Sequence, residues 1–395
     1  MPNILSGIRV LDLTQNIAGP FCTQLLGDFG ATIWKVERPG SGDDARRWMP
    51  TWNGSGTAFL VHNRNKKSIC IELANPKGQA AVQRLARSAD ILVHSMRPET
   101  AEARGFGYDA VSSENSRLIY CAISAFGEIG PLRDLPGYDS LIQAYSGIIS
   151  VTGNPDEPPV RVGVSVIDNA AGLWAFAGIL AALLHRATTG HGMKVSTSLM
   201  EVGVSWMSML LTNYLVTGQV PQKLGSAAPL SAPYEAFRTA DNWIMIAANN
   251  NRHFSQLCAL LGAGQLAEDR RFTSNELRVK NRQELKVAIE QITSTRSASD
   301  WLGLLRGAGI PCSPIRTVDQ LSNDPQVEAL GMIAAMAYPQ NPDFRIIDIP
   351  VSLGNERALK AAPPPALGEH TDEILRAAGF TAAEVTALRA EKAIA

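Results

Sequence analysis

The first part of the chain alternates short apolar runs with longer segments of helical periodicity. The runs expected to form strands are Ile8–Leu13, Thr32–Glu37, Lys67–Leu73, Ala89–His94 and Leu118–Ser124. Helices are predicted at Gly19–Gly30, where Pro20 stands at an early position that helices accept, and at Pro76–Ala89. Strands separated by helices indicate a parallel sheet with helices on both faces, so the pattern predicts an α/β fold.

Parallel sheets of this type bind ligands at the carboxyl ends of their strands. The first predicted strand is followed by Thr14–Pro20, which contains no G-x-G-x-x-G pattern. A dinucleotide cofactor is therefore not expected, although the predicted architecture is of the Rossmann type.

A long apolar helix is predicted around Ala170–Leu184, and Asp168 stands at its start. The apolar run is short for a membrane span, so we interpret it as a buried helix. A carboxylate in such surroundings costs free energy unless it is paired or used. A helix N-terminus favours the ionised carboxylate, which suits a nucleophile. Asp is also a preferred N-cap residue, and position alone leaves both interpretations open.

The pattern changes after about Ser196. Leu199–Gly218 is expected to be one long helix, and Phe237–Thr239 and Trp243–Ala247 are expected to form a hairpin around the turn Ala240–Asn242. The sequence thus predicts two domains. The pattern change makes the middle block, 222–318, a second and smaller domain, between a linker helix at 196–221 and a second linker at 319–335.

Composition is typical of a globular protein and bears on which partners it binds. The chain of 395 residues is 45% hydrophobic and 18% charged, and its net charge of −1 does not suggest a nucleic-acid partner. Its 5 cysteines stand singly, which indicates neither a zinc site nor a disulfide framework. The N-terminus lacks the pattern of a signal peptide, so we expect a cytoplasmic protein without a membrane partner.

Ordered motifs run through nearly the whole chain. They are Gly7–Leu13, Ala18–Pro20, Asp28–Ala31, Lys35–Asp43, Asn63–Ile69, Gly137–Asp139, Gln143–Gly147, Thr152–Gly153, Gly309–Pro314 and Leu367–Glu373. In this order and spacing they resemble the family III CoA-transferases, or CaiB/BaiF family. That family includes formyl-CoA transferase, the carnitine CoA-transferase and the α-methylacyl-CoA racemases.

The resemblance implies a fold and a reaction. The fold is a Rossmann-like large domain with a parallel sheet, plus a smaller α+β domain from the middle of the chain. The large domain is built from both ends of the chain, 1–195 and 336–395. Each chain makes an open ring, and two rings interlock as a homodimer. The reaction moves CoA from an acyl-CoA donor to a small carboxylic acid, through an aspartyl anhydride and an aspartyl-CoA thioester. It needs no metal and no tightly bound cofactor, since coenzyme A enters and leaves as part of the substrate.

The resemblance also assigns the catalytic residues. The family's carboxylate nucleophile lies at the position of Asp168. Gln15 and Asn16, after the first strand, are candidates to stabilise an oxyanion. Asp139 matches a family carboxylate near the active site, with a role in orienting the site or handling protons. An ordinary hydrogen-bonded Asp139 remains the alternative.

Other residues are candidates to bind CoA, because arginine suits phosphate groups. Arg38 matches a family arginine directly, whereas another family arginine aligns with Ala103 and leaves Arg104 as its replacement. The remaining candidates are Arg97, Lys66 and Lys67 for the phosphates, and Trp48 and Tyr138 for the pantetheine arm. Either lysine could instead be an ordinary surface charge.

Two departures from the family pattern affect the choice of reaction. The glycine-rich flap of formyl-CoA transferase is not recognisable, and Ala247–His253 stands near its place. Arg252 or His253 could meet an acceptor carboxylate there, or the segment is simply a polar helix N-terminus. The racemases use a His-Asp pair, but Tyr138 replaces that His, and a tyrosine is a poor base at neutral pH. Transfer is therefore favoured over 2-methylacyl-CoA racemisation, and the intact Asp168 argues against a non-catalytic CoA-binding homologue.

Overall fold

The structure is a computed structural model that describes residues 3–338, 344–354, 356–357 and 361–395. Its contacts divide the chain into two compact units. The large unit comprises 1–148, 162–212 and 325–395, and the small unit comprises 149–161 and 213–324. The domain limits expected from the sequence stay a prediction. They differ from these units in placing residues 149–161 with the first part of the chain.

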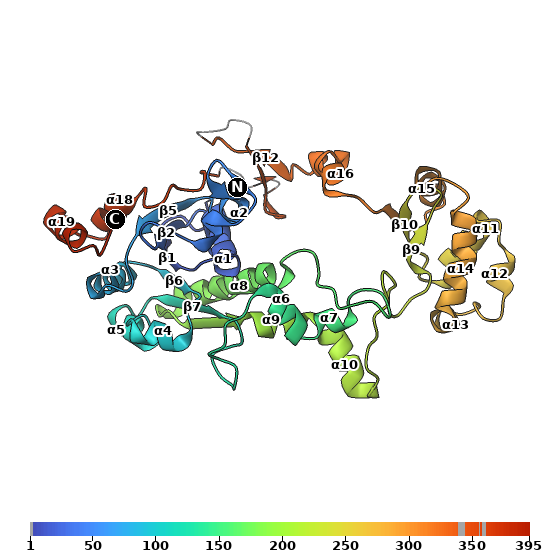
Figure 1. Cartoon of the computed structure of the whole chain (residues 1–395), viewed down its shortest axis with the longest axis horizontal. Coiled ribbons are helices and arrows are strands. Elements are labelled where there is room, and N and C mark those ends of the chain that lie inside the picture. Colours follow the sequence, from blue (N-terminus) through green and yellow to red (C-terminus); the bar gives the residue numbers. More distant parts are fainter. Residues whose placement is uncertain (1–2, 339–343, 355, 358–360) are drawn as a thin grey trace. The chain divides into compact units, whose positions relative to one another are not determined.

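The large unit is built on a six-stranded parallel sheet with the order β5-β2-β1-β6-β7-β8 (Figure 1). Its strands are β1 (Arg9–Leu13), β2 (Thr32–Glu37), β5 (Lys66–Cys70), β6 (Ile91–His94), β7 (Ile119–Ser124) and β8 (Lys194–Ser198). The first five of these confirm the strands predicted from apolar runs. The edge strand β8 escaped prediction because Val195 is its only apolar residue.

Side chains of the sheet alternate between two hydrophobic clusters, as the pleat of a strand requires. Val10 packs in the cluster shared with α1 (Ala18–Asp28) and α8 (Val166–Thr189). Its neighbour Leu11 packs on the other face, in the cluster that holds residues of α3 (Pro76–Arg87) and α18 (Thr371–Ala377). The expected α/β arrangement with helices on both faces is therefore present.

Helix α8 has 24 residues and is longer than the apolar run suggested. By length and composition alone it could cross a membrane. It packs instead along α1, with Ile167, Ala171 and Ile179 fully buried. Gly172 permits this close approach, because a Cβ atom at that position would lie 2.5 Å from the carbonyl oxygen of Ala18.

The small unit has its own sheet and its own core. Strands β9 (Tyr234–Arg238), β10 (Trp243–Ala247) and β11 (Cys312–Pro314) are antiparallel, in the order β11-β10-β9, and the predicted hairpin is confirmed. Helices α11 (Asn251–Leu260), α14 (Arg282–Thr293) and α15 (Ala298–Gly307) contribute to its hydrophobic cluster.

The single helix expected at Leu199–Gly218 is wrong. The segment forms α9 (Leu199–Trp206) and α10 (Ser208–Thr217), which are bent by 63° relative to each other. Helix α9 buries Leu199 and Val202, whereas α10 buries none of its residues, so the two halves share no packing surface that would keep them straight.

The remaining elements are short or lie at the periphery of the units. They are η1 (Asp44–Arg47), α2 (Thr57–His62), α4 (Pro98–Ala103), α5 (Tyr108–Glu114), α6 (Asp139–Tyr145), α7 (Ile148–Val151), α12 (Gln265–Glu268), α13 (Asn275–Lys280), α16 (Val318–Ser322), α17 (Pro325–Ala329), α19 (Ala382–Ala390), β3 (Thr51–Trp52), β4 (Ser55–Gly56), β12 (Ile333–Ala335), β13 (Arg345–Ile347), β14 (Ser352–Leu353) and β15 (Glu356–Arg357).

A buried ion pair lies inside the large unit. The ammonium group of Lys66 is 3.1 Å from a carboxylate oxygen of Asp12, and both side chains are fully buried. Lys66 also donates to the carbonyl oxygen of Pro20 and to the side chain of Asn63. Burial by itself raises the pKa of Asp12, but the charges of Lys66 and Lys35 outweigh it and lower the pKa to about 2. Asp12 is thus a carboxylate whose counter-ions are part of the core.

Replacing Lys66 should destabilise the protein much more than replacing its neighbour Lys67. Lys66→Met removes the ammonium group that is paired with buried Asp12, and breaking a buried ion pair by removing one partner typically costs about 3–5 kcal/mol of unfolding free energy. Lys67→Met breaks only the exposed ion pair with Glu373, for which about 0–1 kcal/mol is typical. Urea denaturation of the two variants at pH 7 measures the difference, and equal losses would contradict a structural role for Lys66.

Candidate active site

A cleft of about 220 Å³ opens at the carboxyl ends of the strands in the large unit. Segments that follow β1, β6 and β7 line it, which is where a parallel α/β sheet is expected to bind a ligand. The lining residues are Gln15–Gly19, Trp48, Ser95–Arg97, Ile123–Ala125, Arg133, Leu135–Tyr138, Asp168 and Leu199.

Asp168 reaches this cleft as the third residue of α8. The N-cap of the helix is Ser165, whose side chain makes no capping hydrogen bond, so Asp168 is not the N-cap. The capping acceptor comes from another helix. One carboxylate oxygen of Asp139 accepts from the backbone N–H groups of Ile167, at 2.8 Å, and Asp168, at 3.2 Å.

A hydrogen bond from Gln143 fixes the side chain of Asp139. Asp139 is the first residue of α6, is 6% exposed and accepts a hydrogen bond from the side-chain amide of Gln143. The amide oxygen of Gln143 in turn accepts from the backbone N–H of Val162, at 2.9 Å. Asp139 therefore orients the first turn of α8, and it does not line the cleft.

The helix N-terminus was expected to favour the ionised form of Asp168, but other effects at this position favour the protonated form. Burial and, second, the negative charge of Asp139 raise the pKa of Asp168 from 3.8 to about 7. Both effects disfavour the charged form of a carboxyl group. Near neutral pH, Asp168 is consequently present in both protonation states.

The structure brings together several residues that the sequence singled out. Gln15, Trp48, Arg97 and Tyr138 line the cleft together with Asp168. Asn16 lines it too and adopts a φ of 71°, in the left-handed region that Asn tolerates better than most residues. Trp48 and Tyr138 are 36% and 62% exposed, so each presents an aromatic surface to a ligand.

Other predicted CoA-binding residues do not line this cleft. The guanidinium group of Arg38 lies 2.5 Å from Asp44 on the surface, and Arg104 follows the end of α4. Lys67 forms an exposed ion pair with Glu373 of α18. Lys66 is buried in its bonds to Asp12, Pro20 and Asn63, so its ammonium group is not available to a phosphate, and its prediction as a CoA ligand is corrected accordingly.

Arg252 and His253 lie in the small unit, at the start of α11. The side chain of Asn250 caps this helix by accepting from the backbone N–H of His253, at 2.8 Å. The geometry is that of a polar helix N-terminus, the alternative that the sequence left open.

Sequence reasoning missed Arg133 as a lining residue. It lies in the loop between β7 and α6, is half-exposed and pairs with Asp134 at 3.2 Å. A charged residue in a loop gives no periodic signal. The usable clue was that this loop leaves the carboxyl end of a central strand.

Comparisons with known proteins agree with this geometry. The family model described as CoA-transferase family III matches residues 5–371. The chain is 38% identical over 373 residues to the succinyl-CoA:glutarate CoA-transferase of Mus musculus, covering 94% of this chain and 86% of the relative. It is 35% identical over 385 residues to the succinate–glutarate CoA-transferase of Agrobacterium fabrum, covering 95% and 96% of the two chains.

A solved structure also resembles this one over its full length. It is a CaiB/BaiF family protein from Brucella suis, which is 34% identical in sequence and aligns with a TM-score of 0.85. The alignment covers 96% of this chain and 100% of that chain. Sequence and fold therefore point to the same family.

The raised pKa of Asp168 should make stability depend on pH. In the unfolded chain the group has its ordinary pKa of 3.8, and in the folded chain about 7. Between these values the folded state binds more protons, so the stability that protonated Asp168 contributes is lost as the pH rises through 7. The unfolding free energy of Asp168→Asn minus that of the wild type should therefore be larger at pH 8 than at pH 5, as measured by urea denaturation.

A second variant tests the part played by Asp139. Asp139→Asn removes the like charge and keeps an amide oxygen that can accept from the helix N-terminus. In the Asp139→Asn background, the effect of Asp168→Asn on the unfolding free energy should depend less on pH than it does in the wild type. A stability difference between Asp168→Asn and the wild type that is the same at pH 5 and pH 8 would contradict the raised pKa.

Proposed function

Because the chain belongs to CoA-transferase family III, we propose that it moves CoA from an acyl-CoA to a free dicarboxylic acid with Asp168 as the nucleophile. The observation that carries the proposal is the position of Asp168. Its carboxyl group lies in the cleft at the carboxyl ends of the strands, with a pKa of about 7. A carboxylate partly removed from water is a stronger nucleophile than a fully hydrated one, and at neutral pH a large fraction is ionised.

The reaction then proceeds through two covalent species. A carboxylate oxygen of Asp168 attacks the thioester carbonyl and expels CoA thiolate, which leaves a mixed anhydride on the enzyme. The thiolate attacks the aspartyl carbonyl of the anhydride, so the donor acid leaves and an aspartyl-CoA thioester forms. The acceptor acid repeats the two steps in reverse order and departs as the new acyl-CoA. The acyl activation is conserved throughout, provided that the cleft retains the thiolate and excludes water.

The tetrahedral intermediates carry an oxyanion that needs hydrogen-bond donors. Gln15 and Asn16 line the cleft with Asp168 and have side-chain amides. The backbone N–H of Asn16 already donates to Asp43, so it is the side-chain amides that we assign to the oxyanion. Asp139 orients the backbone of Asp168 by accepting its N–H, and after burial its charge is the second cause of the raised pKa of Asp168.

Arginines of the large unit are the candidate anion-binding groups. Arg97 lines the cleft at the carboxyl end of β6, and we assign it to the CoA phosphates, with Arg38 and Arg104 as more distant candidates. Arg133, on the same loop as Tyr138, we assign to the second carboxylate of the acceptor. Trp48 and Tyr138 offer apolar surface for the pantetheine arm.

A dicarboxylate is the substrate class that these observations favour. The relatives from Mus musculus and Agrobacterium fabrum both have glutarate in their names. A second carboxylate needs a cation near the nucleophile, and Arg133 supplies one in this cleft. Arg252 and His253 stay predictions for the same role.

A racemase of the same superfamily is the alternative reaction. It needs acid/base groups on two sides of the α-carbon. The described residues that line the cleft include Asp168 but no histidine, and Tyr138 stands where the racemases have one. Transfer fits this set of residues better than racemisation or mere CoA binding.

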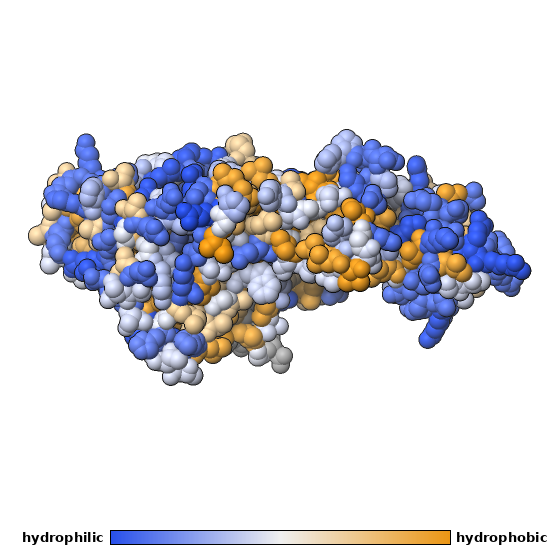
Figure 2. All heavy atoms as spheres, turned by 90° about the horizontal axis from the view of Figure 1, so that it is seen from below, coloured by the Kyte–Doolittle hydropathy of each residue, from blue (hydrophilic) through white to orange (hydrophobic). Residues whose placement is uncertain are grey.

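The assembly and compartment remain proposals as well. An interlocked homodimer is supported by exposed apolar side chains of α8 and α9, among them Leu173, Trp174, Leu184 and Trp206, which are 54–73% exposed. Figure 2 shows apolar surface (orange) among the hydrophilic residues. The 5 cysteines are free, which supports a reducing compartment such as the cytoplasm.

Isotope exchange between acyl-CoAs and acids should reveal the reaction. With succinyl-CoA and labelled glutarate, mass spectrometry should show glutaryl-CoA and free succinate without ATP. Hydroxylamine added during turnover should leave a hydroxamate on Asp168, and Asp168→Ala should show neither product nor modification. Absence of CoA exchange with every acid tested, together with α-hydrogen exchange in a 2-methylacyl-CoA, would reject the transferase in favour of the racemase.

Two arginine variants should separate the donor from the acceptor. Arg133→Gln should raise KM for glutarate by about 10-fold or more and leave KM for acetate nearly unchanged, because only glutarate has the second carboxylate; loss of one charge-assisted hydrogen bond is worth about 1.5–3 kcal/mol. Arg97→Gln should raise KM for succinyl-CoA by a similar factor. Equal effects of Arg133→Gln on both acceptors would remove Arg133 from the acceptor site.

A further inference from the structure

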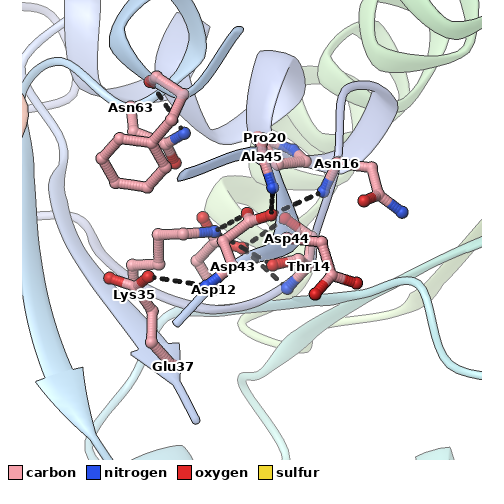
Figure 3. Close-up of polar contacts among 12 residues, drawn as sticks. Asp12, Thr14, Asn16, Pro20, Lys35, Glu37, Asp43, Asp44, Ala45 and Asn63 are labelled. Carbon is pink, nitrogen blue, oxygen red and sulfur yellow. Dashed lines mark hydrogen bonds and ion pairs between the residues drawn. The ribbon is translucent and has the colours of Figure 1, made fainter. Parts of the chain in front are cut away.

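The two members of a buried ion pair bind the backbone on either side of Gln15. The ammonium group of Lys35 lies 2.9 Å from one carboxylate oxygen of Asp43, and both side chains are fully buried. Lys35 also donates to the carbonyl oxygen of Thr14, at 3.0 Å. The other carboxylate oxygen of Asp43 accepts from the backbone N–H of Asn16, at 3.1 Å. The residues on either side of Gln15 are thus bound to the two members of one ion pair (Figure 3).

Further hydrogen bonds fix the position of the ion pair. Lys35 comes from β2, an inner strand of the parallel sheet, and Asp43 from the loop that precedes η1. The backbone N–H of Asp43 donates to Glu37, at 3.0 Å, and its side chain caps η1 by accepting from Ala45, at 3.0 Å. Movement of the ion pair would therefore break bonds to a strand and to a helix.

The backbone that the pair holds is unusual in conformation. Asn16 has a φ of 71°, a region that costs an ordinary L-residue roughly 1–2 kcal/mol. Thr14 is fixed as well, since its N–H donates to Asp12 at 2.9 Å. A buried ion pair contributes little net stability compared with apolar side chains of similar size. Its effect on the conformation of residues 14–16 is thus a better reason for its presence than stability.

We propose that Lys35 and Asp43 are positioning residues that hold the Gln15 side chain at the place where the oxyanion forms. The inference rests on the proposed transferase function and on Gln15 as an oxyanion donor. A donor that is displaced by a fraction of an ångström stabilises the transition state less, while the binding of the acyl-CoA ground state changes little. The pair consequently acts on kcat through Gln15, without touching the substrate.

The double variant Lys35→Met/Asp43→Leu tests the proposal, because it removes both charges and leaves no lone buried ion of the pair. We expect a folded protein with kcat lowered by about 10–100-fold, as for a small misplacement of a catalytic group, and KM for succinyl-CoA within about twofold of the wild type. The matched control Lys77→Met/Glu391→Leu removes an exposed ion pair of the same type and should leave both constants unchanged. Asp43→Asn, which keeps an acceptor for Asn16, should give a smaller fall in kcat.

A double-mutant cycle distinguishes positioning from a general structural effect. In a Gln15→Ala background, the Lys35/Asp43 substitutions should lower kcat no further, since the group that they position is absent. If the combined variant instead loses kcat by the product of the two separate factors, the proposal is overturned. If the double variant does not fold, the same cycle with Lys35→Gln/Asp43→Asn decides, because this pair is also uncharged and keeps an acceptor for Asn16.

Amide hydrogen exchange keeps this proposal separate from the proposed function. In the wild type the N–H of Asn16 should exchange slowly, and in Lys35→Met/Asp43→Leu at least about 10-fold faster, whatever the activity. A wild type that transfers CoA but shows a rapidly exchanging Asn16 N–H would overturn the positioning role alone. A wild type with a protected Asn16 and no CoA exchange would instead overturn the function.

Discussion

The structure depends on charges that are buried beneath the carboxyl ends of β1 and β2. Asp12 pairs with Lys66, Lys35 with Asp43, and Glu37 with Arg46 at 2.7 Å, and these side chains lie almost entirely out of water. Each charge has a partner, because an isolated one would cost several kcal/mol. The partners come from different strands and loops, so the pairs fix how β1, β2, β5 and the segment before η1 meet. Lys35 and Asp43 are bonded to the backbone of Thr14 and Asn16, next to residues 15–19 that line the cleft.

At the cleft itself, the requirements of chemistry and of stability oppose each other. The first turn of α8 needs a negative acceptor, and Asp139 provides one. Burial and, second, this charge raise the pKa of Asp168 to about 7 and so make ionisation of Asp168 costly. That cost favours the role of nucleophile that we propose for Asp168, since a poorly hydrated anion is more reactive. Asp139 thus serves the fold by capping a helix and serves the site by setting the protonation of its neighbour.

The sequence predicted those features that depend on local pattern. Apolar runs located the inner strands β1, β2, β6 and β7, because inner parallel strands are buried on both faces and read as continuous apolar segments. They also located the edge strand β5, where Ile69 and Cys70 are buried. The edge strand β8 and the bend between α9 and α10 were not predictable in this way, since tertiary contacts decide both. The resemblance to a known family indicated Asp168 and Arg97, and position and residue chemistry added Gln15, Trp48 and Tyr138. All five line one cleft.

The charged residues show where such reasoning ends. Lys66 and Lys67 are adjacent lysines in a strand, and alternation places one side chain inside and the other outside. A basic motif before an apolar strand suggests phosphate binding for both, because a sequence does not show that Asp12, 54 positions away, already neutralises Lys66. Arg133 was missed for the converse reason, since its loop becomes part of the cleft only when β7 is in place. For a charged residue in a parallel α/β protein, the register of the sheet therefore decides between structural and ligand-binding roles, and residue type does not.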